Sequence, residues 1–139
     1  MKTLYTATAT VHGGREGHGK TSDGKLDMDL SKPKEMGGSG GSGVNPEQLF
    51  AIGYSACFLG AVHHVARIQK KNIGEASITG DVHIGTGDDN GLELAVDLHC
   101  KLPGVSFDEA KAITNEAHEK VCPYSKATRG NIAVNIIVE

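Results

Sequence analysis

Tryptophan is absent from this chain of 139 residues, aromatic residues make up only 4%, and the formal net charge is −3. Few side chains are therefore available on which nucleic-acid bases stack. The lack of a basic excess also removes the positive field that attracts a phosphate backbone. We expect no nucleic-acid partner.

Signals for export and membrane insertion are also missing. Residues 1–6 do not form the apolar core of a secretory signal. The longest apolar run, 49–62, has 14 residues, whereas a helix needs about 20 to cross a bilayer. His63, His64 and Arg67 follow this run closely. We expect a cytoplasmic protein without membrane association, with the apolar helix buried in protein.

No motif for a metal or a nucleotide is convincing. The seven histidines show no metal-ligand spacing. His118 and Cys122 can share a helix face, but two ligands do not make a zinc site. The glycines of segment 37–43 follow no strand and precede no Lys-Ser/Thr pair, which disfavours both phosphate-binding loops. We expect a flexible loop there and no cofactor.

Strands and helices are both indicated, and the length is that of a single domain, 1–139. Period-two alternation predicts strands, the first two forming a hairpin, and period-3.6 patterns predict helices. The expected strands are 4–11, 25–30, 78–84, 92–102 and 132–138, and the expected helices are 45–71 and 106–121.

Capping signals open both helices. Asn45 with Gln48, and Ser106 with Glu109, have the spacing of reciprocal N-caps. The first helix is apolar almost all the way round, which predicts a central position. The second should bury one stripe and stop at Pro123; its stripe is Phe107, Ala110, Ile113, Ala117 and Val121.

The three cysteines differ in context. Cys57 lies inside the apolar helix, and Cys122 stands at the end of the second helix. Cytosolic chains rarely hold permanent disulfides, so two thiols on two helices suggest a redox pair. Free cysteines are also often core residues, and that interpretation stays open for both. It is preferred for Cys100, which alternates in register with five aliphatic residues.

A reactive Cys57 needs help from elsewhere in the chain. An unperturbed thiol, with a pKa of about 8.5, is only slightly ionised at neutral pH. Apolar neighbours raise that pKa further, so a cation must be supplied. Arginine stays charged when buried but then needs a carboxylate. Arg15 and Glu47 offer such groups, although by position alone they read as a solvated arginine and a helix-start glutamate.

Five blocks occur in order along the chain. They are Gly14-Arg15-Glu16-Gly17, the glycine-rich segment 37–43, Asn45-Pro46-Glu47-Gln48-Leu49, Gly53-Tyr54-x-Ala56-Cys57-Phe58, and Cys122-Pro123-Tyr124-Ser125-x-Ala127-Thr128-Arg129-Gly130-Asn131. With these blocks the chain resembles the organic hydroperoxide resistance proteins of the osmotically inducible protein C (OsmC) superfamily, and the resemblance covers nearly its whole length.

The resemblance implies an α+β, OsmC-like fold, with bent antiparallel sheets around two central helices in an intertwined homodimer. It implies a peroxidase that reduces organic hydroperoxides without metal or flavin and is recycled by a dithiol such as a lipoylated protein. Cys57 would be the peroxidatic cysteine and Cys122 the resolving one, with Arg15 and Glu47 as the activating pair. The alternatives are a small-molecule binding protein with inert thiols and a hydrolase that pairs Cys57 with a histidine.

Helix geometry adds one expectation. Glu47 and Cys57 are ten residues apart on one predicted helix, which is about 15 Å along its axis and on different faces. We therefore predict that Arg15 and Glu47 meet Cys57 of the partner subunit.

Overall fold

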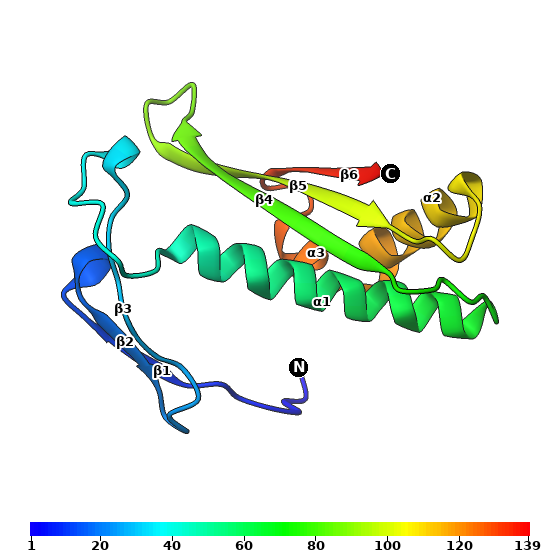
Figure 1. Ribbon diagram of the computed structural model, residues 1–139, viewed down its shortest axis with the longest axis horizontal. Coiled ribbons are helices and arrows are strands. Elements are labelled where there is room, and N and C mark those ends of the chain that lie inside the picture. The colour runs from blue at the N-terminus through cyan, green and yellow to red at the C-terminus, as the bar shows by residue number, and fades with distance from the viewer. The chain divides into compact units, whose positions relative to one another are not determined.

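The computed structural model describes residues 1–139, and the chain divides into two compact units, Met1–Leu49 and Phe50–Glu139. The first holds a three-stranded sheet and the second holds a three-stranded sheet with helices (Figure 1). The prediction of one domain, 1–139, stays a prediction.

In the first unit, β1 (Ala9–His12), β2 (His18–Thr21) and β3 (Asp27–Asp29) form an antiparallel sheet in that order. Residues 4–8, predicted as strand, are not in the sheet. The predicted hairpin is also wrong in its pairing, because β3 pairs with β2 and not with β1. Strand β2 was missed because His-Gly-Lys-Thr shows no apolar alternation.

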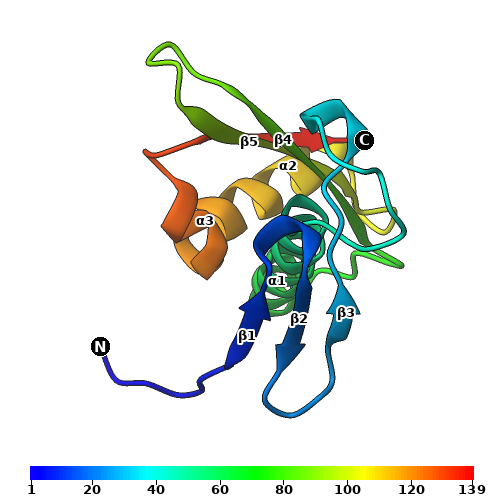
Figure 2. The same ribbon diagram turned by 90° about the vertical axis from the view of Figure 1, so that its left-hand side faces the viewer.

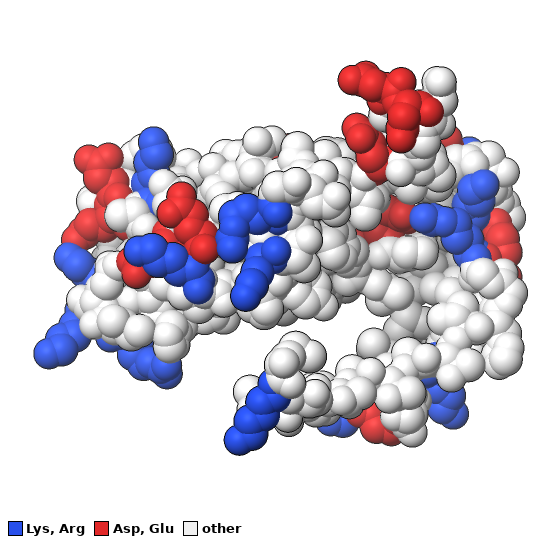
Figure 3. All heavy atoms as spheres, turned by 180° about the vertical axis from the view of Figure 1, so that it is seen from behind, with Lys and Arg blue, Asp and Glu red and all other residues white.

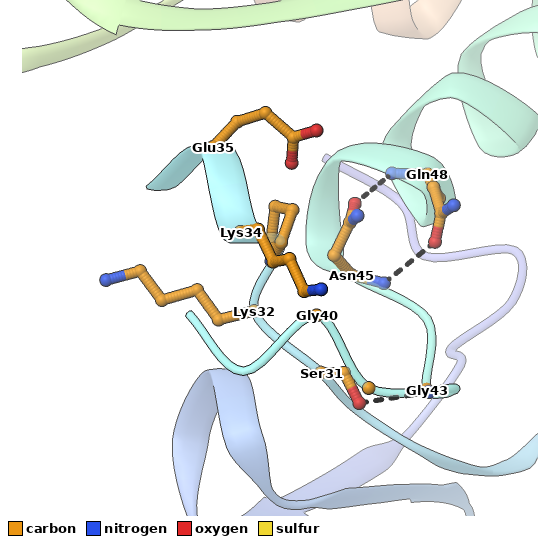
Figure 4. Close-up of a pocket in the computed structure, with 10 residues that line it drawn as sticks. Ser31, Lys32, Lys34, Glu35, Gly40, Gly43, Asn45 and Gln48 are labelled. Carbon is orange, nitrogen blue, oxygen red and sulfur yellow. Dashed lines mark hydrogen bonds between the residues drawn. The ribbon is translucent and has the colours of Figure 1, made fainter. Parts of the chain in front are cut away.

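The glycine-rich segment is an anchored loop. It follows the 3₁₀ turn η2 (Lys34–Met36), and Gly40, with a φ of +65°, donates its N–H to the Lys32 carbonyl. Gly43 donates to the Ser31 hydroxyl, and beyond it Asn45 and Gln48 form the predicted reciprocal cap (Figure 4). Hydrogen bonds thus fix a segment whose composition predicted flexibility.

In the second unit, β4 (Ser77–Thr86) pairs antiparallel with β5 (Leu92–Lys101), and β6 (Ala133–Val138) pairs with β5 in parallel. This sheet is therefore mixed, whereas antiparallel sheets were expected. The parallel pair follows from the connection, since the chain between β5 and β6 is long enough for a helical crossover. The helices of this unit lie on one face of the sheet (Figures 1 and 2).

The predicted second helix, 106–121, is two segments, α2 (Phe107–Glu116) and a π-helical turn η3 (Ala117–Val121), and a further helix α3 (Pro123–Thr128) follows it. The Ser106–Glu109 capping box is confirmed. Pro123 not only ends one helix but starts α3, which the sequence reading missed, because proline suits a first helical position. Phe107, expected in the buried stripe, is 59% exposed. At 100° per residue it points about 90° from the centre of that stripe.

The core of the second unit lies between α1 (Pro46–Ile68), the sheet and α2. It includes Cys100, which is fully buried as expected. Its buried members are Tyr54, Phe58, Ala61, Val62, Val65, Ala66, Ile73, Val96, Leu98, Cys100, Leu102, Ala110, Ile113, Ala117 and Cys122.

Helix α1 is buried on one face only, and Ile52 on it is 70% exposed. The expectation of burial all round is therefore not met within one chain. By length and composition alone this 23-residue helix is able to cross a membrane, which the 14-residue run did not indicate. Helices in the cores of soluble proteins pass the same test, so the finding is weak evidence.

Candidate active site

Arg15 and Glu47 form a two-pronged ion pair. The two guanidinium Nη atoms of Arg15 donate to the two carboxylate oxygens of Glu47 over 2.8 and 2.7 Å. The Arg15 side chain is 34% exposed and that of Glu47 only 13%. The hydrogen bond to Glu47 raises the pKa of Arg15, and the same bond lowers the pKa of Glu47. Both groups are therefore charged across the physiological range.

Local structure brings these residues together across 32 positions of sequence. Arg15 lies in the turn η1 (Gly14–Glu16), directly after Gly13 and Gly14, which both have positive φ. Glu47 lies in the first turn of α1, just after the Asn45 cap, where the helix dipole favours a carboxylate. The guanidinium of Arg15 on η1 therefore contacts the carboxylate of Glu47 in the first turn of the capped helix α1.

The two thiols of Cys57 and Cys122 are neighbours. Their Sγ atoms are 3.7 Å apart, and neither takes part in a disulfide. Cys57 is half-buried on α1, whereas Cys122 precedes α3 and accepts a hydrogen bond from the Ser125 N–H at 3.4 Å. The sequence reading placed Cys122 at an exposed helix end, but it is only 1% exposed, because α3 continues the chain over it.

Within the second unit the Cys57 thiol is not activated. Burial raises the pKa of Cys57, the neighbouring Cys122 thiol raises it further, and a hydrogen bond from the Tyr124 backbone opposes this. The thiol is thus protonated at neutral pH, and a cation is still needed. Burial raises the pKa of Cys100 to about 12, so that thiol is inert.

Three aromatic rings from α1 and α3 pack against one another. Phe50, Tyr54 and Tyr124 pack with ring centroids 5.8 to 6.1 Å apart. Gly53 makes room for this cluster, since a Cβ there would lie 3.3 Å from the Tyr124 hydroxyl. The sequence reading did not assign roles to Tyr54 or Tyr124, although Tyr124 stands two residues after Cys122.

The structure therefore forms two pairs from the four predicted site residues, Arg15 with Glu47 and Cys57 with Cys122. The first pair belongs to the unit Met1–Leu49 and the second to the unit Phe50–Glu139. No group of three or more His, Cys, Asp or Glu side chains is arranged to hold a metal ion.

On the face shown in Figure 3, acidic and basic groups are interspersed.

Comparisons with known proteins show which family the chain and its fold are similar to. Residues 38–137 match the family model of OsmC-like proteins. The organic hydroperoxide resistance protein of Xanthomonas axonopodis pv. citri is 51% identical, over 97% of this chain and 94% of its own. OhrB of Bacillus subtilis is 44% identical over 96% of each chain. The crystal structure of an organic hydroperoxide resistance protein from Legionella pneumophila superposes with a TM-score of 0.93 at 48% identity, covering 99% of both chains.

The fold is of the α+β, OsmC-like class, and it brings two free thiols into contact. The chain belongs to the organic hydroperoxide resistance proteins of the OsmC family.

Proposed function

We propose that the protein is a cysteine-based peroxidase that reduces organic hydroperoxides to alcohols. The observation that carries this proposal is the 3.7 Å contact between two free thiols, Cys57 and Cys122, in a member of this family. The distance is about 1.7 Å longer than a disulfide bond, which measures about 2.05 Å. A small rearrangement is enough to join the two sulfurs.

In the first step the Cys57 thiolate attacks one oxygen of the hydroperoxide. The O–O bond breaks, the alkoxide takes a proton and leaves as an alcohol, and Cys57 becomes a sulfenic acid. Arg15 stabilises the thiolate and polarises the peroxide, while Glu47 holds the guanidinium in place.

In the second step Cys122 attacks the Cys57 sulfur. The S–O bond breaks, hydroxide leaves with the thiol proton as water, and a Cys57–Cys122 disulfide remains. An external dithiol, such as a lipoylated protein, reduces the disulfide by exchange. We propose that this cycle uses no metal or flavin and operates in the cytoplasm.

The surroundings of Cys57 favour apolar substrates over hydrogen peroxide. Phe50 stacks on Tyr124 at 6.1 Å beside the thiols and offers apolar surface to an alkyl chain. Phe58, the residue that follows Cys57, is fully buried in the core and is not available for this role.

We propose that the charged pair acts across a homodimer. Helix α1 is continuous from Pro46 to Ile68, which disfavours the alternative that a break near Gly53 folds Glu47 back onto Cys57 of the same chain. The two residues are separated by about 15 Å along the helix axis. Arg15 and Glu47 of one subunit would then activate Cys57 of the other.

The test is to change each cysteine to serine and follow peroxide consumption with a dithiol reductant. Cys57→Ser should abolish turnover. Cys122→Ser should react once, trap a Cys57 sulfenic acid and overoxidise with excess peroxide. Normal turnover by the Cys57→Ser protein would contradict the proposal.

The second candidate is a small-molecule binding protein with non-catalytic thiols. The raised pKa of Cys57 favours it, since a protonated thiol is a poor nucleophile. Such a protein would bind apolar ligands but would neither consume hydroperoxide nor form the disulfide, and the same assay separates the two.

A further inference from the structure

A chain of buried hydroxyl groups lies beside the thiol pair. The Tyr54 hydroxyl is 3.0 Å from the hydroxyls of both Ser125 and Thr128. Nδ1 of His118 is 2.9 Å from the same Ser125 hydroxyl. We call the set His118, Ser125, Tyr54 and Thr128 the hydroxyl chain. None of its members is among the proposed site residues.

Proton counting gives the hydroxyl chain a direction. The Thr128 hydroxyl lies 3.0 Å from the Tyr124 carbonyl, which only accepts, so its proton points there. Thr128 therefore accepts from Tyr54, Tyr54 accepts from Ser125, and Ser125 accepts from Nδ1–H of His118. Only this arrangement places a proton in every contact.

The ring of His118 is accordingly a donor to Ser125 through Nδ1. Burial and the positive charge of Arg129 lower the pKa of His118, while Glu119 opposes this. The ring is thus neutral at pH 7, with its proton on Nδ1. His118, which the sequence analysis weighed with Cys122 as a zinc ligand and rejected, has the Ser125 hydroxyl as its partner.

The hydroxyl chain ties the two thiol-bearing segments together. Ser125 uses its backbone N–H to hold the sulfur of Cys122, and its hydroxyl to reach Tyr54 on α1. Tyr54 precedes Cys57 by three residues, about one helical turn, and lies on the same side of α1. The spacing between the two sulfurs therefore depends on this link.

Resting on the peroxidase function proposed above, we propose that His118 is a positioning residue for the resolving step. By donating to Ser125 it completes the link that holds the Cys122 sulfur against Cys57. Without this donor the attack that releases water and forms the disulfide should slow about tenfold, the cost of roughly one buried hydrogen bond. Formation of the Cys57 sulfenic acid should keep its rate.

The experiment separates the two steps by rapid acid quench and mass spectrometry. Gain of one oxygen on Cys57 reports the first step, and loss of two hydrogens reports the disulfide. The partition between disulfide and overoxidised Cys57 is measured against peroxide concentration. His118→Ala and Ser125→Ala should both shift this partition about tenfold towards overoxidation.

The conservative variant distinguishes positioning from general loss of stability. His118→Asn keeps an N–H at the place of Nδ1 and should restore the wild-type partition. His83→Ala is the control, because His83 contacts Asp97 on the outer face of the sheet. If His118→Ala keeps the wild-type partition, or if His118→Asn fails to restore it, the proposal is wrong.

Two further measurements keep the test decisive if the His118→Ala variant does not fold. If His118→Ala is unfolded, Ser125→Ala decides, and a wild-type partition in that variant overturns the proposal. A wild-type protein whose Cys57 gains no oxygen contradicts the peroxidase function itself. That result differs from normal oxidation followed by unchanged resolution, which contradicts only the role of His118.

Discussion

The two units of the chain are organised differently. The unit Phe50–Glu139 has 15 buried hydrophobic residues between its helices and sheet. The unit Met1–Leu49 has three short strands and one buried hydrophobic residue, Leu30. The thiol pair is therefore held by a complete core, whereas the charged pair stands on a scaffold with almost none.

The sheet of the first unit presents an apolar face of its own. A shallow hollow of about 100 Å³ lies on it, lined by Ala9, Val11, Gly19, Lys20, Thr21, Leu26, Met28, Leu30 and Leu49. A three-stranded sheet needs a covered hydrophobic face for stability. The thiol pair therefore has a complete core around it within one chain, whereas the unit that holds Arg15 and Glu47 has an apolar hollow that the proposed homodimer would cover.

The largest effect should come from recombining the pairs. An Arg15→Ala/Glu47→Ala chain and a Cys57→Ser chain should each be inactive alone. After subunit exchange, heterodimers carry one Cys57 facing the intact Arg15 and Glu47 of the other chain. Activity should rise from zero to a level set by the heterodimer fraction, measured as hydroperoxide consumption.

Exchange must be shown independently, by mass spectrometry of the intact dimers. If heterodimers form and no activity appears, the charged pair does not act across subunits.

The next effect compares the two scaffolds. Leu98→Ala removes a fully buried side chain from the second unit and should cost about 2–5 kcal/mol of unfolding free energy. Met28→Ala changes the apolar face of the first unit and should mainly raise the dimer dissociation constant. Chemical denaturation and sedimentation measure the two quantities. If Leu98→Ala and Met28→Ala raised the dimer dissociation constant equally, the two units would not differ in their dependence on the partner subunit.

A smaller effect concerns the third thiol. Cys100→Ala should leave turnover intact and destabilise the core by about 1–2 kcal/mol, because only packing is lost. Calorimetry and the peroxidase assay check both parts. A peroxide-induced disulfide containing Cys100 would overturn its structural role.

The smallest effect is a pH dependence in the first unit. The ring of His18 contacts the carboxylates of Asp29 at 2.8 Å and Asp27 at 2.6 Å, and these bonds raise its pKa. Protonated His18 therefore stabilises the folded state fully at pH values below its unfolded-state pKa of about 6.5. This stabilisation is lost as the pH rises through the folded-state pKa of His18.

His18→Gln removes this titration. Denaturation midpoints of the two proteins should differ most below pH 6.5 and converge at higher pH. A difference between the two midpoints that grows as pH rises would contradict the raised pKa of His18.

Local signals predicted some of these features well. The caps at Asn45 and Ser106 and the alternation of 92–102 were read correctly, because each depends on neighbouring residues. The parallel placement of β6 was not, since it depends on the distant strand β5. Strand β2 was missed because it lacks apolar alternation, and the burial of Cys122 because α3 was not predicted.

The candidate site shows the same limit. The Arg15–Glu47 contact joins residues 32 positions apart, and no spacing rule predicts it. The resemblance to a family placed these two residues in one site, and the structure shows them bonded. The hydroxyl chain of His118, Ser125, Tyr54 and Thr128 went unnoticed, because a buried polar network is visible only when the helices are packed.

The central claim is that Cys57 and Cys122 form one redox pair. The most direct measurement treats the fully reduced protein with one equivalent of an organic hydroperoxide, then maps disulfides by mass spectrometry after blocking free thiols. We predict a Cys57–Cys122 disulfide, one alcohol released per chain, and Cys100 still free. Three blocked thiols with the hydroperoxide unconsumed would contradict the account.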